Sequence, residues 1–97
     1  MKPALVISDS DNVATALEPL AAGRTIDAGG VVVTVRESIA SGHKIALQRI
    51  PAGGAVVKYG SPIGTASTDI EAGAHVHTHN VASGRGRGDL PARGAVS

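Results

Sequence analysis

One seven-residue pattern recurs four times and limits the folds open to this 97-residue chain. The pattern is aliphatic-x-x-Gly-x-x-aliphatic, and its copies span residues 20–26, 39–45, 50–56 and 70–76. The uneven spacing of the copies excludes a solenoid of equal repeats. We interpret each copy as a corner. Its first aliphatic residue anchors it in the core, its glycine supplies a positive φ angle, and its last aliphatic residue starts a strand.

The segments between these corners predict a mostly β fold with little helix. β-branched and aliphatic runs bounded by polar or glycine-rich turns favour strands at 4–7, 13–17, 30–36, 44–49, 56–59, 63–66 and 75–80. Residues 13–17 also suit a short helix capped by Ser10 or Asp11. We favour a strand, because Pro19 leaves too few residues for a helix of ordinary length. We expect one domain over residues 1–80 and a flexible Gly/Arg-rich tail over residues 81–97.

Composition excludes several classes of function. The chain has no cysteine, which rules out disulfides, thiolate catalysis and cysteine-based zinc sites. It has no Phe or Trp, so it offers no aromatic platform for single-stranded nucleic acid. Tyr59, the one aromatic residue, is expected in the core. The net charge of +1 does not indicate a basic nucleic-acid binder, and no apolar run is long enough for a membrane span or signal peptide. We therefore expect a cytoplasmic protein.

Three of the four histidines alternate along one stretch, as His75, His77 and His79. Alternate residues of a strand share one face, so a strand over residues 75–80 would place these three imidazoles side by side. Such a row suits a metal ion, an anionic substrate or proton transfer.

Several short motifs occur together in a fixed order. They are Asp-Asn-Val-Ala from residue 11, Gly-His-Lys-Ile-Ala-Leu from 42, Lys-Tyr-Gly from 58, Pro-Ile-Gly from 62 and His-Thr-His-Asn from 77. As a set they resemble the N-terminal SAF domain of the altronate and galactarate dehydratase family. The alpha subunit of sulfolactate sulfo-lyase is similar. Where the family tends to have Ala-Thr-x-Asp-Ile, this chain has Ala-Ser-Thr-Asp-Ile at residues 66–70, which keeps the hydroxyl.

The resemblance implies a β-clip fold, a small bent domain of antiparallel strands. It also implies a component of a sugar-acid dehydratase that is active only with a large catalytic subunit. The chain would then be a stand-alone small subunit or the N-terminal piece of a longer protein, and it can form a homo-oligomer. A divalent metal, Fe²⁺ or Mn²⁺, is the implied cofactor.

The dehydration itself needs a base, an acid and a group that stabilises enolate-like charge. We predict catalytic roles for His43, His77 and His79, and metal ligation by His77 and His79 with further ligands from the large subunit or the substrate. The alternatives are that these two side chains bind substrate or line the subunit interface, and that His43 only bonds the backbone of its turn. His75, nearer the corner, is expected to face solvent.

The remaining candidates are polar side chains near the histidines. Lys44 and Lys58 can bind a sugar-acid carboxylate or can be solvated outward charges. Asn80 can bind a substrate hydroxyl or cap the end of the strand. Asp69 can support a histidine or cap a corner, whereas Asp11 is expected to form a turn.

Two other functions remain open at this stage. The sulfolactate sulfo-lyase reaction would expel sulfite instead of water, and the motifs do not separate it from dehydration. The other is a non-catalytic SAF module that binds a carbohydrate or a protein partner, because fold alone does not define activity.

Overall fold

The computed structural model describes residues 2–83, and these residues form strands and turns with no helix. The strands are β1 (Ala4–Leu5), β2 (Val13–Ala16), β3 (Thr25–Ala28), β4 (Val31–Thr34), β5 (Lys44–Ala46), β6 (Ala55–Lys58), β7 (Ser61–Ala66), β8 (His75–Val76) and β9 (Val81–Ser83). Every pairing between them is antiparallel. The mostly β fold predicted from the sequence is therefore confirmed. No helix within residues 2–83 is long and apolar enough to cross a bilayer.

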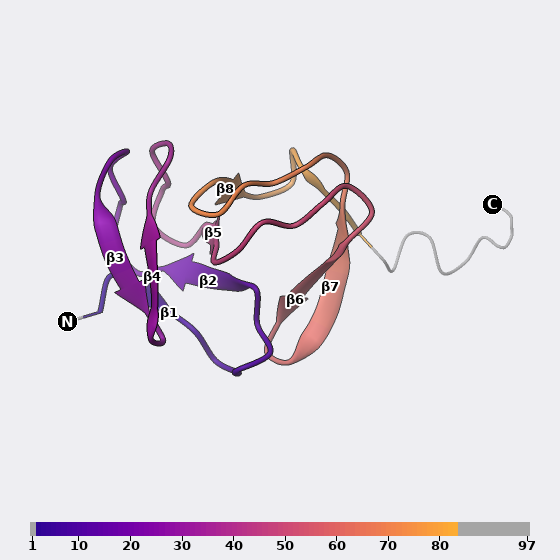
Figure 1. Ribbon diagram of the computed structural model, residues 1–97, viewed down its shortest axis with the longest axis horizontal. Coiled ribbons are helices and arrows are strands. Elements are labelled where there is room, and N and C mark those ends of the chain that lie inside the picture. The colour runs from indigo at the N-terminus through magenta and orange to yellow at the C-terminus, as the bar shows by residue number, and fades with distance from the viewer. Residues whose placement is uncertain (1, 84–97) are drawn as a thin grey trace, which may run out of the picture.

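Three small sheets build the molecule (Figure 1). The central sheet has the order β1-β2-β5-β8, the hairpin β3-β4 forms a second sheet, and β6-β7-β9 form the third. The β3-β4 and β6-β7 hairpins lie at opposite ends of the view, with the central strands between them. This arrangement leaves the middle of the molecule to β5 and β8, which carry or adjoin the histidines.

The four predicted corners are present with the expected backbone. Their glycines all have positive φ angles, at Gly23 (91°), Gly42 (88°), Gly53 (84°) and Gly73 (87°). The leading aliphatic residues are at most 2% exposed, and they pair through isolated bridges, Leu20 with Ile39 and Ile50 with Ile70. The succession of corner, hairpin, corner and strand therefore occurs twice, over residues 20–46 and 50–76, and we call these two segments the halves of the domain.

The two halves have separate aliphatic cores. The first contains Leu20, Ile39 and Ile45, and the second contains Ile50, Ile70 and Val76. The central sheet divides them, because adjacent residues of one strand enter different cores: in β5, Ile45 belongs to the first and Ala46 to the second. Alternation of side chains across a strand produces this arrangement.

The structure corrects several sequence-based boundaries. The predicted strand over residues 75–80 ends at Val76, and residues 77–80 form a turn. Strand β3 was not predicted, because Thr25–Ala28 mixes polar and apolar residues directly after a corner. The segment 4–7 pairs only at Ala4–Leu5. The strand predicted at 13–17 is present as Val13–Ala16.

Tyr59 was expected in the core, and this prediction is wrong. Its side chain is 59% exposed, and its φ of 58° places it with Gly60 in the two-residue turn of the β6-β7 hairpin. Positive φ at both central residues defines the turn that best fits the twist of a hairpin, which explains why the ring points outward.

The C-terminal boundary stays a prediction. Val81–Ser83, the first residues of the expected tail, form β9 and pair with β7. Residues 84–97 lie outside the described part of the chain.

Candidate functional site

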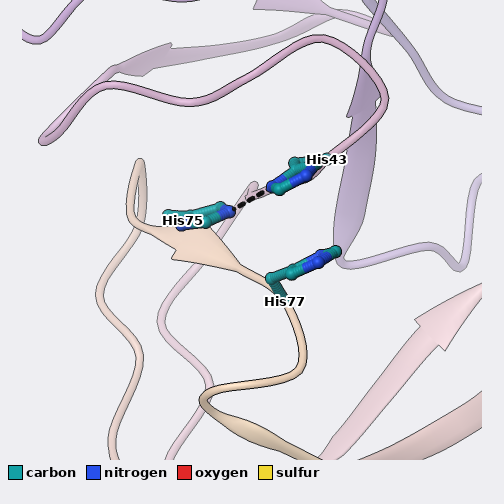
Figure 2. Close-up of side chains that lie close together, drawn as sticks. All are labelled: His43, His75 and His77. Atoms are coloured by element: carbon teal, nitrogen blue, oxygen red, sulfur yellow. Dashed lines mark hydrogen bonds between the residues drawn. The ribbon is translucent and has the colours of Figure 1, made fainter.

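Antiparallel pairing of β5 with β8 brings His43 and His77 together. In this pairing Lys44 lies opposite Val76, and Ile45 lies opposite His75. One step further out, His43 and His77 face each other as a cross-strand pair. Their ring centroids are 3.8 Å apart and their planes differ by 6°, so the rings stack (Figure 2).

His75 joins the pair through a hydrogen bond. Its Nε2 atom lies 2.8 Å from Nδ1 of His43, and the dashed line in Figure 2 marks this contact. One of the two nitrogens must carry the proton and the other must accept it, so at least one ring is neutral when the bond forms. The expectation that His75 faces solvent is therefore wrong: its ring is half-buried against two other imidazoles.

We call His43, His75 and His77 the histidine cluster. One ring nitrogen from each lies within 4.8 Å of the other two. Three nitrogen donors at this separation can bind a metal ion, hold an anion or transfer a proton.

His79 is not part of the cluster, because it lies two residues beyond His77, in the turn that follows β8. Its side chain is exposed in the following turn, and its ring lies 5.0 Å from that of His75 with a tilt of 37°. The predicted row of three aligned imidazoles on one strand is therefore replaced by a cluster that combines His75 of β8 with His77, directly after β8, and His43, directly before β5.

Asn80 holds the turn that carries these histidines. Its side-chain oxygen accepts from the His77 amide at 3.0 Å, and its amide nitrogen donates to the His75 carbonyl at 2.8 Å. The residue is only 7% exposed. Both ends of the amide are thus occupied by backbone, which favours the capping role over the substrate-binding role.

The surroundings lower the basicity of two rings in the site. Burial lowers the pKa of His75, the positive charges that His79 and His43 can carry lower it further, and Glu37 opposes the shift. Burial also lowers the pKa of His77, as do the neighbouring His43, Lys44 and His79. Both shifts favour the neutral imidazole, which is the form that accepts protons and binds metals.

The two candidate lysines lie close to each other. Burial lowers the pKa of Lys44, and the charge of Lys58 lowers it further. Neither lysine forms an ion pair with any residue in the range 2–83. The ammonium of Lys58 lies 4.7 Å from the centroid of the Tyr59 ring. Two neighbouring cations without a carboxylate between them form an electropositive site that suits an anion.

Two pockets adjoin the histidines. The smaller, of about 210 Å³, is lined by Lys44, Ile63, His77, Thr78 and Val81. The larger, of about 480 Å³, is lined by Pro19, Leu20, Ala21, Ser38, Ile39, Ala40, His43 and His75. The histidine cluster thus contributes to a small pocket next to a lysine and to a larger, mainly apolar one.

Several acidic residues have structural roles. Asp69 accepts from the Ala52 amide at 2.8 Å and pairs with Arg49, so it caps a corner and supports no histidine. Glu37, which sequence reasoning missed, accepts from the His75 amide at 3.1 Å. No motif marks Glu37, and only the folding of the second corner brings it to β8.

Asp11 forms a turn, as expected. Its carboxylate accepts from the amides of Ser8 at 3.1 Å and Gly60 at 2.8 Å. Partial desolvation raises the pKa of Asp11, but the backbone donors outweigh it and the net pKa lies below its usual value.

The fold and site together define a small all-β domain that presents clustered imidazoles and two neighbouring lysines, neither of which forms an ion pair within residues 2–83. Residues 2–84 match the SAF domain of altronate/galactarate dehydratases, and the chain belongs to this family. The resemblance inferred from the short motifs is thereby confirmed.

Curated relatives fall into two groups. The altronate dehydratase of Bacillus subtilis is 48% identical over 80 residues, which are 82% of this chain and 16% of that protein. The altronate dehydratase of Escherichia coli is 53% identical over 70 residues, or 72% of this chain and 14% of that protein. The (2R)-sulfolactate sulfo-lyase subunit alpha of Paracoccus pantotrophus is 45% identical over 56 residues, covering 58% of this chain and 84% of that subunit. The chain therefore spans a small fraction of the dehydratases and most of the sulfo-lyase subunit.

Proposed function

We propose that this chain is the SAF component of a sugar-acid dehydratase of the altronate/galactarate type, active only with a large catalytic subunit or region. The observation that carries this proposal is the 48% identity to an altronate dehydratase over 80 residues. In such a reaction a base removes the proton next to the carboxylate, an acid protonates the departing hydroxyl, and the enol becomes a 2-keto-3-deoxy acid. The small domain supplies side chains to a site that the large subunit completes.

The proposed roles of the imidazoles and the lysines differ: the imidazoles transfer protons and the lysines bind the substrate. His43, His77 and His79 are the proposed catalytic histidines, since imidazole exchanges protons near pH 7. Lys44 and Lys58 bind the substrate carboxylate, because their charges have no acidic partner within residues 2–83. Asn80 acts by holding the histidine turn, since both ends of its amide already bond backbone.

The cofactor proposed for this reaction is Fe²⁺ or Mn²⁺, which would polarise the substrate carboxylate when bound. Imidazole nitrogens suit iron better than manganese, which prefers oxygen ligands. The donor set on this chain therefore favours iron. His77 belongs both to the ligand pair predicted from the sequence, His77 and His79, and to the histidine cluster.

A sulfo-lyase alpha subunit is the second candidate. The relative from Paracoccus pantotrophus is matched over 84% of its length, so a free-standing subunit can consist of little more than this domain. The same electropositive groups would bind a sulfonate as readily as a carboxylate. Cytoplasmic location and homo-oligomerisation are further parts of the proposal.

Reconstitution with a large subunit of the dehydratase type tests the function. The mixture is assayed for 2-keto-3-deoxy acid from altronate or galactarate, and for sulfite from sulfolactate, with Fe²⁺ or Mn²⁺ added. We expect His77→Ala and His79→Ala each to lower turnover by about 100-fold or more, the usual effect of losing an acid–base group or ligand. Glu18→Gln, on an exposed surface ion pair, is the control. Undiminished turnover in both histidine variants would remove their catalytic role.

A further inference from the structure

The two halves of the domain repeat one arrangement of corners but differ in the side chains that lie between those corners. In each half, the leading aliphatic residues of two corners pair in an antiparallel bridge, Leu20 with Ile39 and Ile50 with Ile70. In both bridges each amide donates to the carbonyl of its partner, at 2.7–2.9 Å. The residues beside the two bridges therefore hold equivalent positions.

Charged side chains lie beside the bridge of the second half. Arg49 comes directly before Ile50, at the start of the third corner. Asp69 and Glu71 come directly before and after Ile70, at the start of the fourth corner. Arg49 pairs with Asp69 at 3.1 Å and with Glu71 at 3.4 Å. The second half therefore joins its two corners with its own ion pairs.

The equivalent positions of the first half carry small or uncharged side chains. Pro19 takes the place of the arginine, and Ser38 and Ala40 take the places of the two carboxylates. All three line the pocket of about 480 Å³, together with Leu20 and Ile39. The ion pair between the two ends of the first corner involves none of the lining residues. The space between the corners is thus left open in the first half.

This open pocket adjoins the histidine cluster. His43 and His75 line it, and a hydrogen bond of 2.8 Å joins their rings. Its lining includes no lysine, arginine or carboxylate. A sugar acid needs polar partners along its length, and the smaller pocket beside Lys44 and His77 offers it a cation. The larger pocket suits an apolar side chain instead.

In the altronate dehydratases this domain is a small part of a much larger protein. It corresponds to 16% of the Bacillus subtilis protein and 14% of the Escherichia coli protein. In the proposed function, a large catalytic part must reach the imidazoles to complete the site. The uncharged pocket borders two of these imidazoles, so a partner seated in it buries apolar surface and contacts the cluster at the same time.

We infer that the large catalytic subunit or region docks on the first half of this domain and inserts an uncharged, apolar side chain between the first and second corners. The inference rests on the proposed function, because it takes that subunit or region as the occupant. Removal of the apolar side chain from water stabilises the complex, and one well-packed anchor can dominate the affinity of an interface. The histidine cluster then lies between a docking pocket and a substrate pocket.

Site-specific photo-crosslinking tests where the large subunit docks. Because the chain has no cysteine, Ala40→Cys places a single thiol in the pocket, and Glu71→Cys places one at the equivalent position of the second half. Each variant is labelled with a benzophenone maleimide, mixed with the large subunit used for reconstitution, and irradiated. We expect Ala40→Cys to crosslink to the large subunit with a yield at least about fivefold above that of Glu71→Cys. Equal yields, or crosslinks only between copies of this chain, would overturn the inference.

A variant that gives the first half the ion pairs of the second half tests the affinity. Pro19→Arg, Ser38→Asp and Ala40→Glu together place charged side chains in the pocket, on a backbone arrangement that carries the same residues in the second half. In isothermal titration calorimetry, we expect this triple variant to bind the large subunit at least about tenfold more weakly, because the pocket is no longer open and apolar. Arg49→Ala, which alters the second half alone, is the control and should stay within about twofold of the parent chain. Circular dichroism shows whether each variant is folded.

The remaining outcomes separate docking from catalysis. Unchanged affinity of the triple variant, or an equal loss with Arg49→Ala, overturns the docking assignment. Slower maleimide labelling of Ala40→Cys in the presence of altronate or galactarate alone makes the pocket a substrate site and also overturns it. A complex that crosslinks through the pocket but forms no 2-keto-3-deoxy acid and no sulfite keeps the docking site and removes the proposed function. An active complex without the crosslink does the reverse, and the absence of any complex removes both.

Discussion

At the scale of single residues, the site depends on an asparagine as much as on the histidines. Asn80 joins the His75 carbonyl to the His77 amide, and this clamp sets the spacing of two cluster members. A buried amide with both ends bonded stabilises a turn and is expensive to remove, because the groups it leaves behind lose their partners.

We expect Asn80→Ala to lower the free energy of unfolding by about 2 kcal/mol, since two hydrogen bonds are lost in a buried position. Urea denaturation followed by circular dichroism measures the change. Thr78→Ala, at an exposed position of the same turn, should change stability by less than about 0.5 kcal/mol. Equal stability of the two variants would contradict the clamp.

The lysine pair provides a second test at this scale. The folded pKa of Lys44 lies below its ordinary value of 10.5, because of burial first and Lys58 second. The unfolded chain therefore binds more protons at Lys44 than the folded chain does. Lys44 lowers the free energy of unfolding by its full amount below the folded pKa, and this destabilisation disappears as the pH rises toward 10.5. We predict that Lys58→Met raises the Lys44 titration midpoint, as followed by ¹³C NMR of the lysine side chain, while Glu18→Gln leaves it in place. A midpoint unmoved by Lys58→Met would show that the two charges do not interact.

At the scale of elements, the four corners share one backbone conformation but not one environment. At Gly73 a Cβ atom would collide with the carbonyl oxygen of Thr34, whereas at Gly23 nothing lies within 4 Å. Both have positive φ angles, at 87° and 91°. A substitution at either glycine therefore strains the backbone, but only a substitution at Gly73 also creates a steric clash, so comparing the two separates these effects.

Gly73→Ala should therefore destabilise the domain by roughly 3 kcal/mol or more, from strain and overpacking together. Gly23→Ala should cost only about 1 kcal/mol, since strain alone acts there. Thermal and chemical denaturation of both variants give the comparison. If the two substitutions lower the free energy of unfolding equally, the packing of the fourth corner against β4 does not contribute to stability.

At the scale of the whole molecule, two half-units with separate cores meet at the central sheet, and the histidine cluster lies where β5 of one half pairs with β8 of the other. Because β2 and β5 contribute side chains to both cores, neither core can open without disturbing the other.

We predict a single cooperative unfolding transition. Leu20→Ala in the first core and Ile70→Ala in the second should each destabilise the domain by about 2–4 kcal/mol, with unchanged dependence on denaturant concentration. Circular dichroism and imidazole NMR, which report on the sheets and on the cluster, should give the same midpoint. Two separate transitions in either variant would mean that the halves unfold independently.

The sequence by itself determined the local chemistry of the fold. The four corners, their positive-φ glycines, the aliphatic anchors and most strands follow from short-range patterns, because turn conformation and side-chain alternation depend on neighbouring residues. The family was also readable from short motifs in order.

Only the tertiary structure decided which histidines meet. Alternation along residues 75–79 favoured a row that includes His79, but Asn80 bonds back to His75 and His77 and ends the strand at Val76. His43, distant in sequence, takes the place of His79 because β5 pairs with β8 in a register that sets it opposite His77. Register between strands arises from packing across the whole domain, and no local pattern in this chain encodes it.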